Sequence, residues 1–270
     1  MSYLDKKRYI TKTSIGIIIV KINVKNNCPE VLLVHKRYTY SFQQFIFGNY
    51  HLKQDKQVKD INYSVESLLE QMTTEELLDI WSLNFEQLWY RLCLNVNKQD
   101  VVYNKKYSKF QLSFMQDGGK QLQKLIENTR SRGTLLWEVP KGRKDNNRES
   151  DISCAIREVE EETSIKKQQY IIIPEVRKKI SFISCGVRYV CIYFIAMASA
   201  ELSKSNIGST IYQEPPSLQN IDKMQEVSEV RWYNIQYLRL FDNGNKRLES
   251  LISPAFTLVK KYIKNQLLIK

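Results

Sequence analysis

Two stretches of the sequence determine the fold: residues 142–149, GRKDNNRE, and, after seven further residues, 157–165, REVEEETSI. Apolar residues in this region recur at helical spacing: Ile152, Ala155, Ile156 and Val159. Positions i, i+3, i+4 and i+7 share one face of an α-helix. A second face, turned by about 100° from the first, carries glutamates: Glu158, Glu161 and Glu162. We therefore predict a helix over residues 150–163 whose apolar face enters the core and whose carboxylates lie at the rim of a cleft.

The three glutamates have the chemistry of a divalent-cation site. Like charges at this spacing destabilise a helix by about 0.2–0.5 kcal/mol per pair, and a hard cation such as Mg²⁺ or Mn²⁺ relieves that repulsion. Zinc is disfavoured, because the chain has two histidines and no CxxC pair among its five cysteines. Taken alone, the glutamates could equally form a solvated acidic face. The flanking residues favour the site, since Glu149 can pair with Arg157 and either Ser150 or Asp151 can cap the helix.

The segment resembles the Nudix box, G-x5-E-x7-R-E-U-x-E-E-x-G-U with U apolar, preceded by W-x-x-P-K-G at residues 137–142. The matching positions are Gly142, Glu149, Arg157, Glu158, Val159, Glu161, Glu162 and Ile165. The sequence departs from the pattern twice, because six residues separate Gly142 from Glu149 and Ser164 replaces a glycine. We expect the loop to absorb the extra residue. Ser164 should adopt a left-handed conformation at the helix end, at a cost of up to about 1 kcal/mol.

Over nearly the whole chain, the sequence resembles the Nudix mRNA-decapping enzymes of large nucleocytoplasmic DNA viruses, such as the African swine fever virus type. The segments that carry it are residues 12–16, 36–38, 105–110, 133–138 and 154–158. The resemblance implies a Nudix α/β/α sandwich with an inserted helical domain. It also implies Mg²⁺- or Mn²⁺-dependent hydrolysis of capped mRNA to 7-methyl-GDP and 5′-monophosphate RNA. Members of this group are also linked to the hydrolysis of diphosphoinositol polyphosphates.

The same resemblance implies roles for individual residues of the box. The implied metal ligands are Glu158, Glu161, Glu162 and the carbonyl group of Gly142. Either Glu158 or Glu162 would orient or deprotonate the attacking water. Glu149 would be structural, through its contact with Arg157.

A later loop often supplies one more carboxylate to a Nudix site. Glu226, in the stretch 226–232 (EVSEVRW), fits this role best, and Glu214 is the rival. A loop glutamate is more often simply solvated, so the sequence leaves this choice open.

The pattern along the chain predicts an α/β (α+β) fold with two parts. The predicted strands lie within residues 11–36, 134–138, 171–173, 180–184, 189–197 and 229–232. The predicted helices lie within residues 62–95, 120–130, 150–163 and 249–267, and Thr73 with Glu76 fits a capping box. We predict a Nudix hydrolase domain formed by residues 1–37 and 132–270, with residues 38–131 as a helical insertion that is too long and too patterned to be a loop.

Composition indicates the partner. The 270 residues include 41 basic and 29 acidic side chains, which gives a formal charge of +12. This surplus favours a polyanion such as nucleic acid, an anionic membrane surface or a phosphorylated metabolite, with simple solubility charge as the alternative. The longest apolar run, residues 15–20, is too short for a transmembrane segment, and the N-terminus has no signal-peptide core. We therefore expect a soluble, cytoplasmic protein.

Basic and aromatic residues alternate in the insertion: Lys105, Lys106 and Lys109 with Tyr103, Tyr107 and Phe110. Cations for phosphates beside aromatics for stacking suit single-stranded RNA, whereas a solvated face over an aromatic core is the alternative. Weaker RNA-binding candidates are Lys12, Lys179 and, in the last helix, Lys260, Lys261 and Lys264. An aromatic clamp for the methylated guanine is chemically apt, but three aromatics near the start of the insertion could equally be core: Tyr38, Tyr40 and Phe42.

We therefore expect an mRNA-decapping Nudix hydrolase in which the acidic cluster holds the metal and the basic surplus holds capped mRNA. A Nudix enzyme for diphosphoinositol or dinucleoside polyphosphates is the first alternative; it would share the catalytic residues but would not need the basic insertion. A non-catalytic RNA-binding protein on a decayed Nudix scaffold is the second. The intact set of carboxylates argues against this second alternative. Three glutamates that repel one another would cost stability in a protein that binds no metal.

Overall fold

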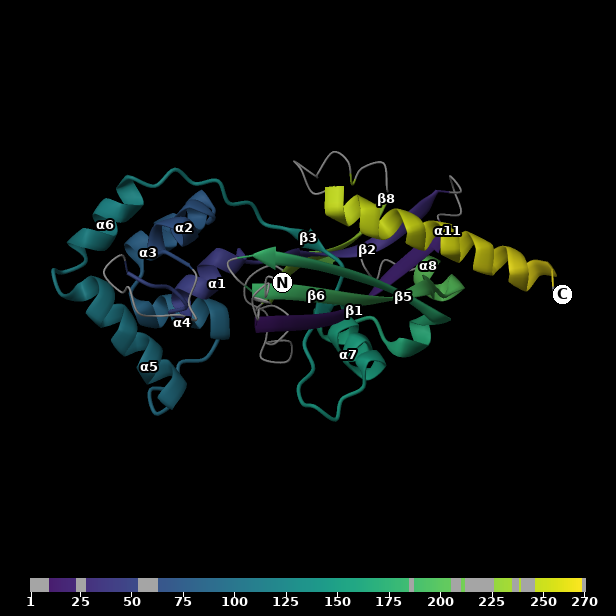
Figure 1. The fold of residues 1–270 in the computed structure, drawn as a ribbon, viewed down its shortest axis with the longest axis horizontal. Helices are drawn as coiled ribbons and strands as arrows, with labels where there is room; N and C mark the ends of the chain where they lie inside the picture. Colours follow the sequence, from purple (N-terminus) through teal and green to yellow (C-terminus); the bar gives the residue numbers. More distant parts are fainter. Residues whose placement is uncertain are drawn as a thin grey trace, which may run out of the picture. The chain divides into compact units, whose positions relative to one another are not determined.

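The computed structural model describes residues 10–22, 28–52, 63–184, 187–204, 210–211, 226–234, 238 and 246–268. The chain divides into two compact units (Figure 1). The first, hereafter the sheet unit, comprises Met1–His35, Trp137–Gln213 and Ser228–Lys270. The second, hereafter the helical unit, comprises Lys36–Leu136 and Glu214–Val227. The predicted bounds of the helical insertion, residues 38–131, remain a prediction.

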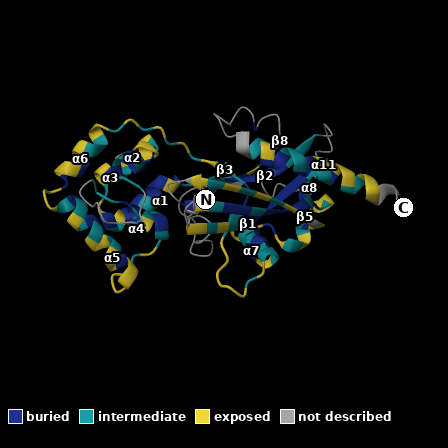
Figure 2. Cartoon of the chain, in the orientation of Figure 1, coloured by how far each residue is buried: buried dark blue, intermediate teal, exposed yellow. Residues whose placement is uncertain are grey.

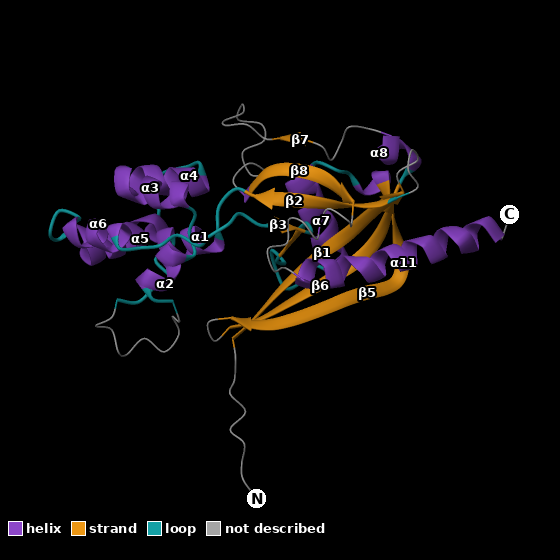
Figure 3. Ribbon diagram, turned by 90° about the horizontal axis from the view of Figure 1, so that it is seen from above, coloured by secondary structure: helices purple, strands orange, loops and turns teal. Residues whose placement is uncertain are grey.

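The strands of the sheet unit form one sheet, which Figure 3 shows in orange. They are β1 (Ile10–Ile22), β2 (Pro29–Lys36), β3 (Trp137–Glu138), β4 (Lys141–Gly142), β5 (Tyr170–Ser184), β6 (Val187–Ala198), β7 (Thr210–Ile211) and β8 (Val227–Asn234). Their order is β5-β6-β1-β2-β8-β7, with β3 on β2 and β4 on β1. β1 is parallel to β6 and antiparallel to β2 and β4. The apolar run predicted to be a strand buried on both faces is confirmed, since Ile15 and residues 17–20 are at most 2% exposed (Figure 2).

Two long helices cover the sheet: α7 (Asp151–Thr163) and α11 (Lys246–Leu268). They lie on opposite sides of it (Figure 1). Ile18 and Val20 of β1 pack with α11 residues in one apolar cluster, and α7 packs on β1, β4 and β6. The shorter helical segments of this unit are Lys167–Gln169, which is a 3₁₀ turn, and α8 (Ala200–Lys204). The predicted α/β/α sandwich is therefore confirmed for the sheet unit.

The structure corrects the strand predictions in two places. β3 begins at Trp137 rather than at residue 134. β5 is one strand where two were predicted, and its register shifts between Ile172 and Arg177. Pro174 lies within this irregularity, and a proline cannot donate a ladder hydrogen bond.

The helical unit contains short helices, most of which begin with a side-chain cap. They are α1 (Tyr40–Ile46), α2 (Val65–Glu70), α3 (Thr74–Ser82), α4 (Phe85–Cys93), α5 (Val101–Phe110), a π-helical turn (Gln111–Met115) and α6 (Lys120–Glu127). The capping box of Thr73 and Glu76 at the start of α3 is confirmed. A second capping box, between Asn84 and Gln87, begins α4. The one helical region predicted over residues 62–95 is thus three helices, α2 to α4, because each cap starts a new one.

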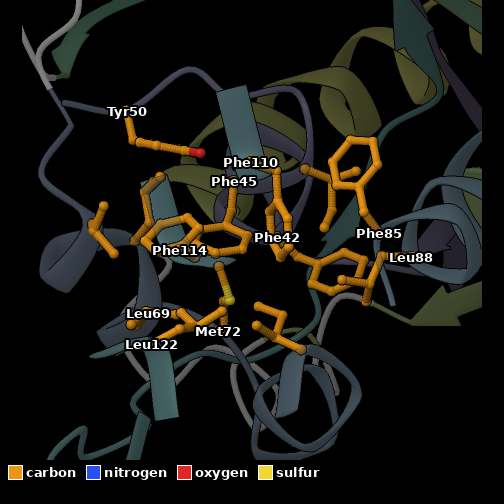
Figure 4. Close-up of a cluster of buried hydrophobic side chains, with 14 of the residues drawn as sticks. Phe42, Phe45, Tyr50, Leu69, Met72, Phe85, Leu88, Phe110, Phe114 and Leu122 are labelled. Carbon is orange, nitrogen blue, oxygen red and sulfur yellow. The ribbon is translucent and has the colours of Figure 1, made fainter. Parts of the chain in front are cut away.

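Aromatic residues form the core of the helical unit (Figure 4). The ring of Phe45 lies 5.4 Å from that of Phe114 and 6.2 Å, edge-on, from that of Phe110. Such pairs stabilise a core by about 0.5–1.5 kcal/mol beyond their burial. Tyr103 and Phe110, two of the aromatics that alternate with lysines in the sequence, are each 4% exposed and belong to this core, as does Phe42. Tyr107 is the exposed member of that series, at 40%.

Candidate active site

The site lies where β4 leads into α7. Gly142 pairs with Ile15 of β1, and α7 packs against both strands. The carboxylate of Glu158 then lies directly against the backbone of Gly142, so that a Cβ atom at this position would overlap the carboxyl group. A larger residue would fit here only if the carboxyl group of Glu158 moved, so a glycine suits this position.

Both ends of α7 are formed as the sequence predicts. The hydroxyl oxygen of Ser150 accepts a hydrogen bond from the amide of Ser153 at 3.1 Å and caps the N-terminus. Ser164 ends the helix in the left-handed region, with φ 63°, so its predicted conformation is confirmed. These two ends fix the register in which the glutamates face the strands.

The carboxylates of the box differ sharply in burial. Glu162 is 5% exposed and accepts a hydrogen bond from the amide of Lys141 at 3.1 Å. The side chain of Glu158 is 13% exposed, and that of Glu161 is 47% exposed. The structure therefore brings Glu158 and Glu162 into the interior edge of the site and leaves Glu161 at its solvent side.

Arg157 connects the box to the preceding loop. Its Nε and Nη2 atoms donate to the two oxygens of Glu149 at 2.9 and 3.1 Å, so the predicted pairing is confirmed. Nη1 donates to Glu158 at 2.9 Å and to Glu161 at 2.8 Å. Nη2 also donates to the carbonyl of Arg143 at 2.8 Å. Hydrogen bonding to Arg157 is the main reason that the pKa of Glu149 lies below its usual range.

The protonation behaviour of Glu158 reflects its burial. Loss of solvent raises its pKa to about 7, Arg157 opposes this shift, and the negative charge of Glu162 adds to it. A buried carboxylate close to two others gains more than an exposed one from a neighbouring cation, because the cation offsets both burial and repulsion. A positive charge near Glu158 would therefore stabilise its ionised carboxylate.

These residues fit a hard divalent cation by their chemistry. Carboxylate and carbonyl oxygens are the ligands that Mg²⁺ and similar ions prefer. In the part of the chain that the structure describes, no three acidic, histidine or cysteine side chains converge on one point as a ready-made cage. Instead, Nη1 of Arg157 provides the positive charge shared by Glu158 and Glu161. In the described structure, the oxygens of Glu158 and Glu161 are therefore engaged by Arg157.

Two neighbours of the site had no assigned role in the sequence. Glu138 accepts a hydrogen bond from Nζ of Lys141 at 2.5 Å, within the stretch that precedes the box. Cys154 is fully buried beside the carbonyl of Gly142, and burial raises the pKa of its thiol to about 12. The thiol of Cys154 is therefore a packing group. Glu138 lies in the W-x-x-P-K-G stretch, so the sequence signal for it was present.

Of the two late carboxylate candidates, Glu226 is among the described residues. Glu226 belongs to the helical unit, where its carboxylate pairs with Nζ of Lys36 at 3.3 Å and its carbonyl accepts from the amide of Arg37. Its side chain is 61% exposed. Glu214 lies outside the described residues. Neither residue is placed beside the Nudix box by the described contacts.

The basic candidates of α5 are not equivalent. Lys105 is exposed and Lys106 is half-buried; burial, followed by the charge of Lys105, lowers the pKa of Lys106. Lys109 donates to the carbonyl oxygens of Gly48 and Tyr50 at 2.7 and 2.8 Å, and lies over the ring of Tyr50. The ammonium group of Lys109 therefore links α5 by hydrogen bonds to the segment that follows α1.

The basic candidates of the sheet unit are dispersed. Lys12 pairs with Tyr189 in the β1–β6 ladder, and Lys179 pairs with Ile192, which is opposite Ile15. Because positions 12 and 15 of one strand point to opposite faces, Lys12 and Lys179 lie on opposite faces of the sheet. Lys260 is exposed on α11, as are Lys261 and Lys264. The structure thus does not place Lys12 and Lys179 in one patch.

The sequence matches known proteins over most of its length. Residues 114–253 match the family model of the NUDIX domain. The chain is 37% identical over 257 residues to the mRNA-decapping protein g5R of African swine fever virus, isolate Warthog/Namibia/Wart80/1980, which covers 94% of this chain and 98% of that protein. A protein of Acanthamoeba polyphaga mimivirus is 24% identical over 227 residues, covering 75% of this chain and 57% of the relative. The crystal structure of a C. elegans Ap4A hydrolase binary complex is 12% identical, with a TM-score of 0.41 and coverage of 92% and 97%. Among the described helices, none is long and apolar enough to cross a membrane.

Proposed function

Because the chain belongs to the Nudix family, we propose that it is an mRNA-decapping hydrolase. It cleaves the pyrophosphate linkage of the cap and releases 7-methyl-GDP and 5′-monophosphate RNA. The observation that carries this proposal is the 37% identity to a viral decapping protein over 94% of the chain, a span that includes both units. Its substrate, capped mRNA, implies that it acts in the cytoplasm of a host cell.

Nudix hydrolases generally use divalent metal ions, and we propose Mg²⁺ or Mn²⁺ for this chain. The oxygens that would hold the ion are those of Glu158, Glu161 and Glu162, together with the carbonyl of Gly142. When bound, such an ion neutralises charge on the diphosphate and lowers the pKa of water. Glu226 is our candidate for a further carboxylate toward the same ion.

The protein groups that handle the proton are the two buried glutamates. Glu158 or Glu162 orients the attacking water and accepts its proton. Glu162 is held by the amide of Lys141 at 3.1 Å, and Glu158 is held by Nη1 of Arg157 at 2.9 Å. Arg157 itself is anchored by Glu149, so Glu149 and Arg157 position the catalytic pair and touch no reacting atom.

The RNA-binding residues that we propose are basic side chains in both units. Lys105 is the most accessible of the α5 lysines, and Lys106 lies beside it. Lys12, Lys179 and Lys260 are additional phosphate contacts in the sheet unit. Lys109 supports this surface indirectly, through its bonds to two backbone carbonyls. Each lysine that contacts a phosphate of a single strand should contribute about 0.7 to the slope of log affinity against log salt.

Product analysis by mass spectrometry tests the proposal. Capped RNA, the free cap dinucleotide and a diphosphoinositol polyphosphate are incubated separately with the protein and Mg²⁺ or Mn²⁺. We expect release of 7-methyl-GDP from capped RNA. Glu162→Gln should abolish this release and leave RNA binding intact, because it removes a carboxylate that is 5% exposed and changes none of the lysines proposed to contact RNA.

Other outcomes would overturn the proposal in distinct ways. Rapid hydrolysis of the inositol compound, or of a dinucleoside polyphosphate, with capped RNA untouched would make this protein a metabolite phosphohydrolase. Activity that persists in Glu162→Gln would remove the assignment of the site. A wild-type protein that binds RNA and releases no product from any substrate would place it among non-catalytic RNA-binding proteins.

A further inference from the structure

The helical unit contains a pocket that the catalytic site does not use. It has a volume of about 210 Å³, and its walls include Lys36, Tyr38, Tyr40, Gln71, Arg132 and Gly133. Pockets that bury drug-sized ligands measure about 300–1,000 Å³. This pocket is therefore of a size for one planar ring system and not for a complete nucleotide.

The walls of the pocket are fixed by backbone contacts. The amides of Arg132 and Gly133 donate to the carbonyls of Glu70 and Met72 at 2.8 and 3.1 Å. A Cβ atom on Gly133 would overlap this backbone, so the two segments lie in direct contact. On the other side, the amide of Lys36 donates to the carbonyl of Leu136 at 2.9 Å. The pocket is thus preformed, which lowers the entropic cost of binding.

The pocket offers an aromatic surface together with amide and hydroxyl groups. Tyr40 lines it and is 47% exposed. Thr39, the preceding residue, is held by two hydrogen bonds to Glu76, which fix the backbone that carries Tyr40. Ser41 and the exposed side chain of Gln71 also line the pocket and contact each other at 3.4 Å. An accessible ring beside a side-chain amide suits a nucleobase, which presents a flat face and hydrogen-bonding edges.

Charge decides which kind of base fits. Lys36 lies in the wall and is paired with Glu226 at 3.3 Å. Arg132, also in the wall, is exposed, and none of the hydrogen bonds or ion pairs among the described residues engages its guanidinium. None of the described residues that line the pocket is acidic. The pocket therefore favours a neutral base followed by an anionic phosphate over a cationic base such as 7-methylguanine.

We propose that this pocket binds one nucleobase of the RNA body, with the base against Tyr40 and its phosphate at Arg132. This inference rests on the proposed function, since it names a subsite for the same RNA substrate. The helical unit would then bind the transcribed part of the RNA without regard to its sequence. The binding subsite would be distinct from the α5 lysines. Gln71 and Ser41 would contact the edge of the base.

Binding of an uncapped, 5′-monophosphorylated RNA oligonucleotide, followed by fluorescence anisotropy, tests the proposal. Tyr40→Ala should weaken binding by about 5- to 100-fold, the range for the loss of one base–aromatic stack. Tyr40→Phe keeps the ring and should bind as the wild type does. The matched control is Tyr90→Ala, which removes a tyrosine of α4 that is 53% exposed and lies outside the pocket.

A salt titration tests the phosphate contact. Arg132→Gln should reduce the slope of log affinity against log salt by about 0.7. Arg130→Gln is its control, because Arg130 is exposed two residues away and does not line the pocket. A 2-aminopurine base placed along the oligonucleotide should be quenched at one position by the wild type and not by Tyr40→Ala.

The results separate this inference from the proposed function. Equal affinities of Tyr40→Ala and Tyr90→Ala for uncapped RNA would overturn it. Loss of 7-methyl-GDP binding in Tyr40→Ala, with uncapped RNA unaffected, would also overturn it and make the pocket a cap site. Release of 7-methyl-GDP by the wild type is measured in parallel, so that failure of decapping, with the RNA-binding pattern intact, would refute the proposed function alone.

Discussion

Substitution of Glu76 should lower the unfolding free energy of the helical unit and leave that of the sheet unit unchanged. The carboxylate of Glu76 is 4% exposed and accepts three hydrogen bonds. One oxygen accepts from the amide of Thr39 at 2.6 Å. The other accepts from the hydroxyl of Thr39 at 2.7 Å and from the amide of Thr73 at 2.9 Å. The side chain thus joins the first residue before α1 to the first residue before α3.

Glu76→Ala leaves two backbone donors without their acceptor, those of Thr39 and Thr73. An unsatisfied buried donor costs about 1–3 kcal/mol, so we expect the helical unit to lose about 2–6 kcal/mol of unfolding free energy. Domains of this size are stable by about 5–15 kcal/mol. The substitution should therefore bring the helical unit close to unfolding while the sheet unit keeps its stability.

Urea unfolding followed by tryptophan fluorescence and by hydrogen exchange can resolve the two units. Trp81 and Trp89 lie in the helical unit, and Trp137 and Trp232 lie in the sheet unit. Glu75→Ala is the matched control, because Glu75 is the exposed neighbour in the same first turn of α3. Equal unfolding midpoints for Glu76→Ala and Glu75→Ala would refute the reasoning, and so would a loss shared equally by both units.

The same carboxylate predicts a pH dependence. Burial raises the pKa of Glu76 above its ordinary value of 4.5, and the hydrogen bonds from Thr39 and Thr73 only partly oppose this. Between 4.5 and the higher folded-state pKa, the folded protein binds more protons than the unfolded chain, so this contribution to stability falls as pH rises. Glu76→Gln cannot titrate. The unfolding free energy of the wild type relative to Glu76→Gln should therefore decrease as pH is raised above 4.5, and a constant difference would contradict the prediction.

Four further substitutions have distinct expected results. Lys105→Gln should lower the slope of log affinity against log salt for RNA binding by about 0.7. Lys109→Gln should instead lower the urea unfolding midpoint of the helical unit, because Lys109 donates to two backbone carbonyls. Equal salt slopes in the two variants would contradict this difference. Ser164→Gly should stabilise the sheet unit by about 0.5–1 kcal/mol in urea unfolding, because the residue has φ 63°. Gly142→Ala should weaken Mn²⁺ binding in calorimetry, because its Cβ overlaps the carboxylate of Glu158, and wild-type affinity would disprove that constraint.

Helical spacing predicted which residues of the box share a face, but it could not predict how deeply each is buried. Glu158, Glu161 and Glu162 lie within about one turn, yet Glu162 is 5% exposed while the side chain of Glu161 is 47% exposed. This difference arises from β1 and β4, against which α7 packs. Burial at the edge of a helix face depends on the neighbouring strands, and a periodicity within one segment carries no information about them.

The aromatic residues of α5 and of the π-helical turn that follows it show a different limit. Tyr103, Tyr107, Phe110 and Phe114 follow the spacing i, i+4, i+7 and i+11, which is that of a buried helix face as much as of a basic and aromatic RNA-binding surface. The structure buries all of them except Tyr107. The ammonium group of Lys109 donates hydrogen bonds to two backbone carbonyls and so has a structural role. Composition could therefore identify a basic helical segment, while the assignment of each side chain to core or surface required the fold.

The loop between Gly142 and Glu149 shows why the extra residue in the box is tolerated. Arg157 holds both ends of this loop, since its Nη2 donates to the carbonyl of Arg143 and its Nε to Glu149. Within the loop, Glu149 also accepts from the amide of Asp145 at 3.0 Å. Every residue from 143 to 148 is exposed, so no core contact fixes the number of residues between these anchors. The spacing from Glu149 to Arg157 has no such freedom, because the first turns of α7 lie between them and a change of one residue would rotate Arg157 by about 100° away from Glu149.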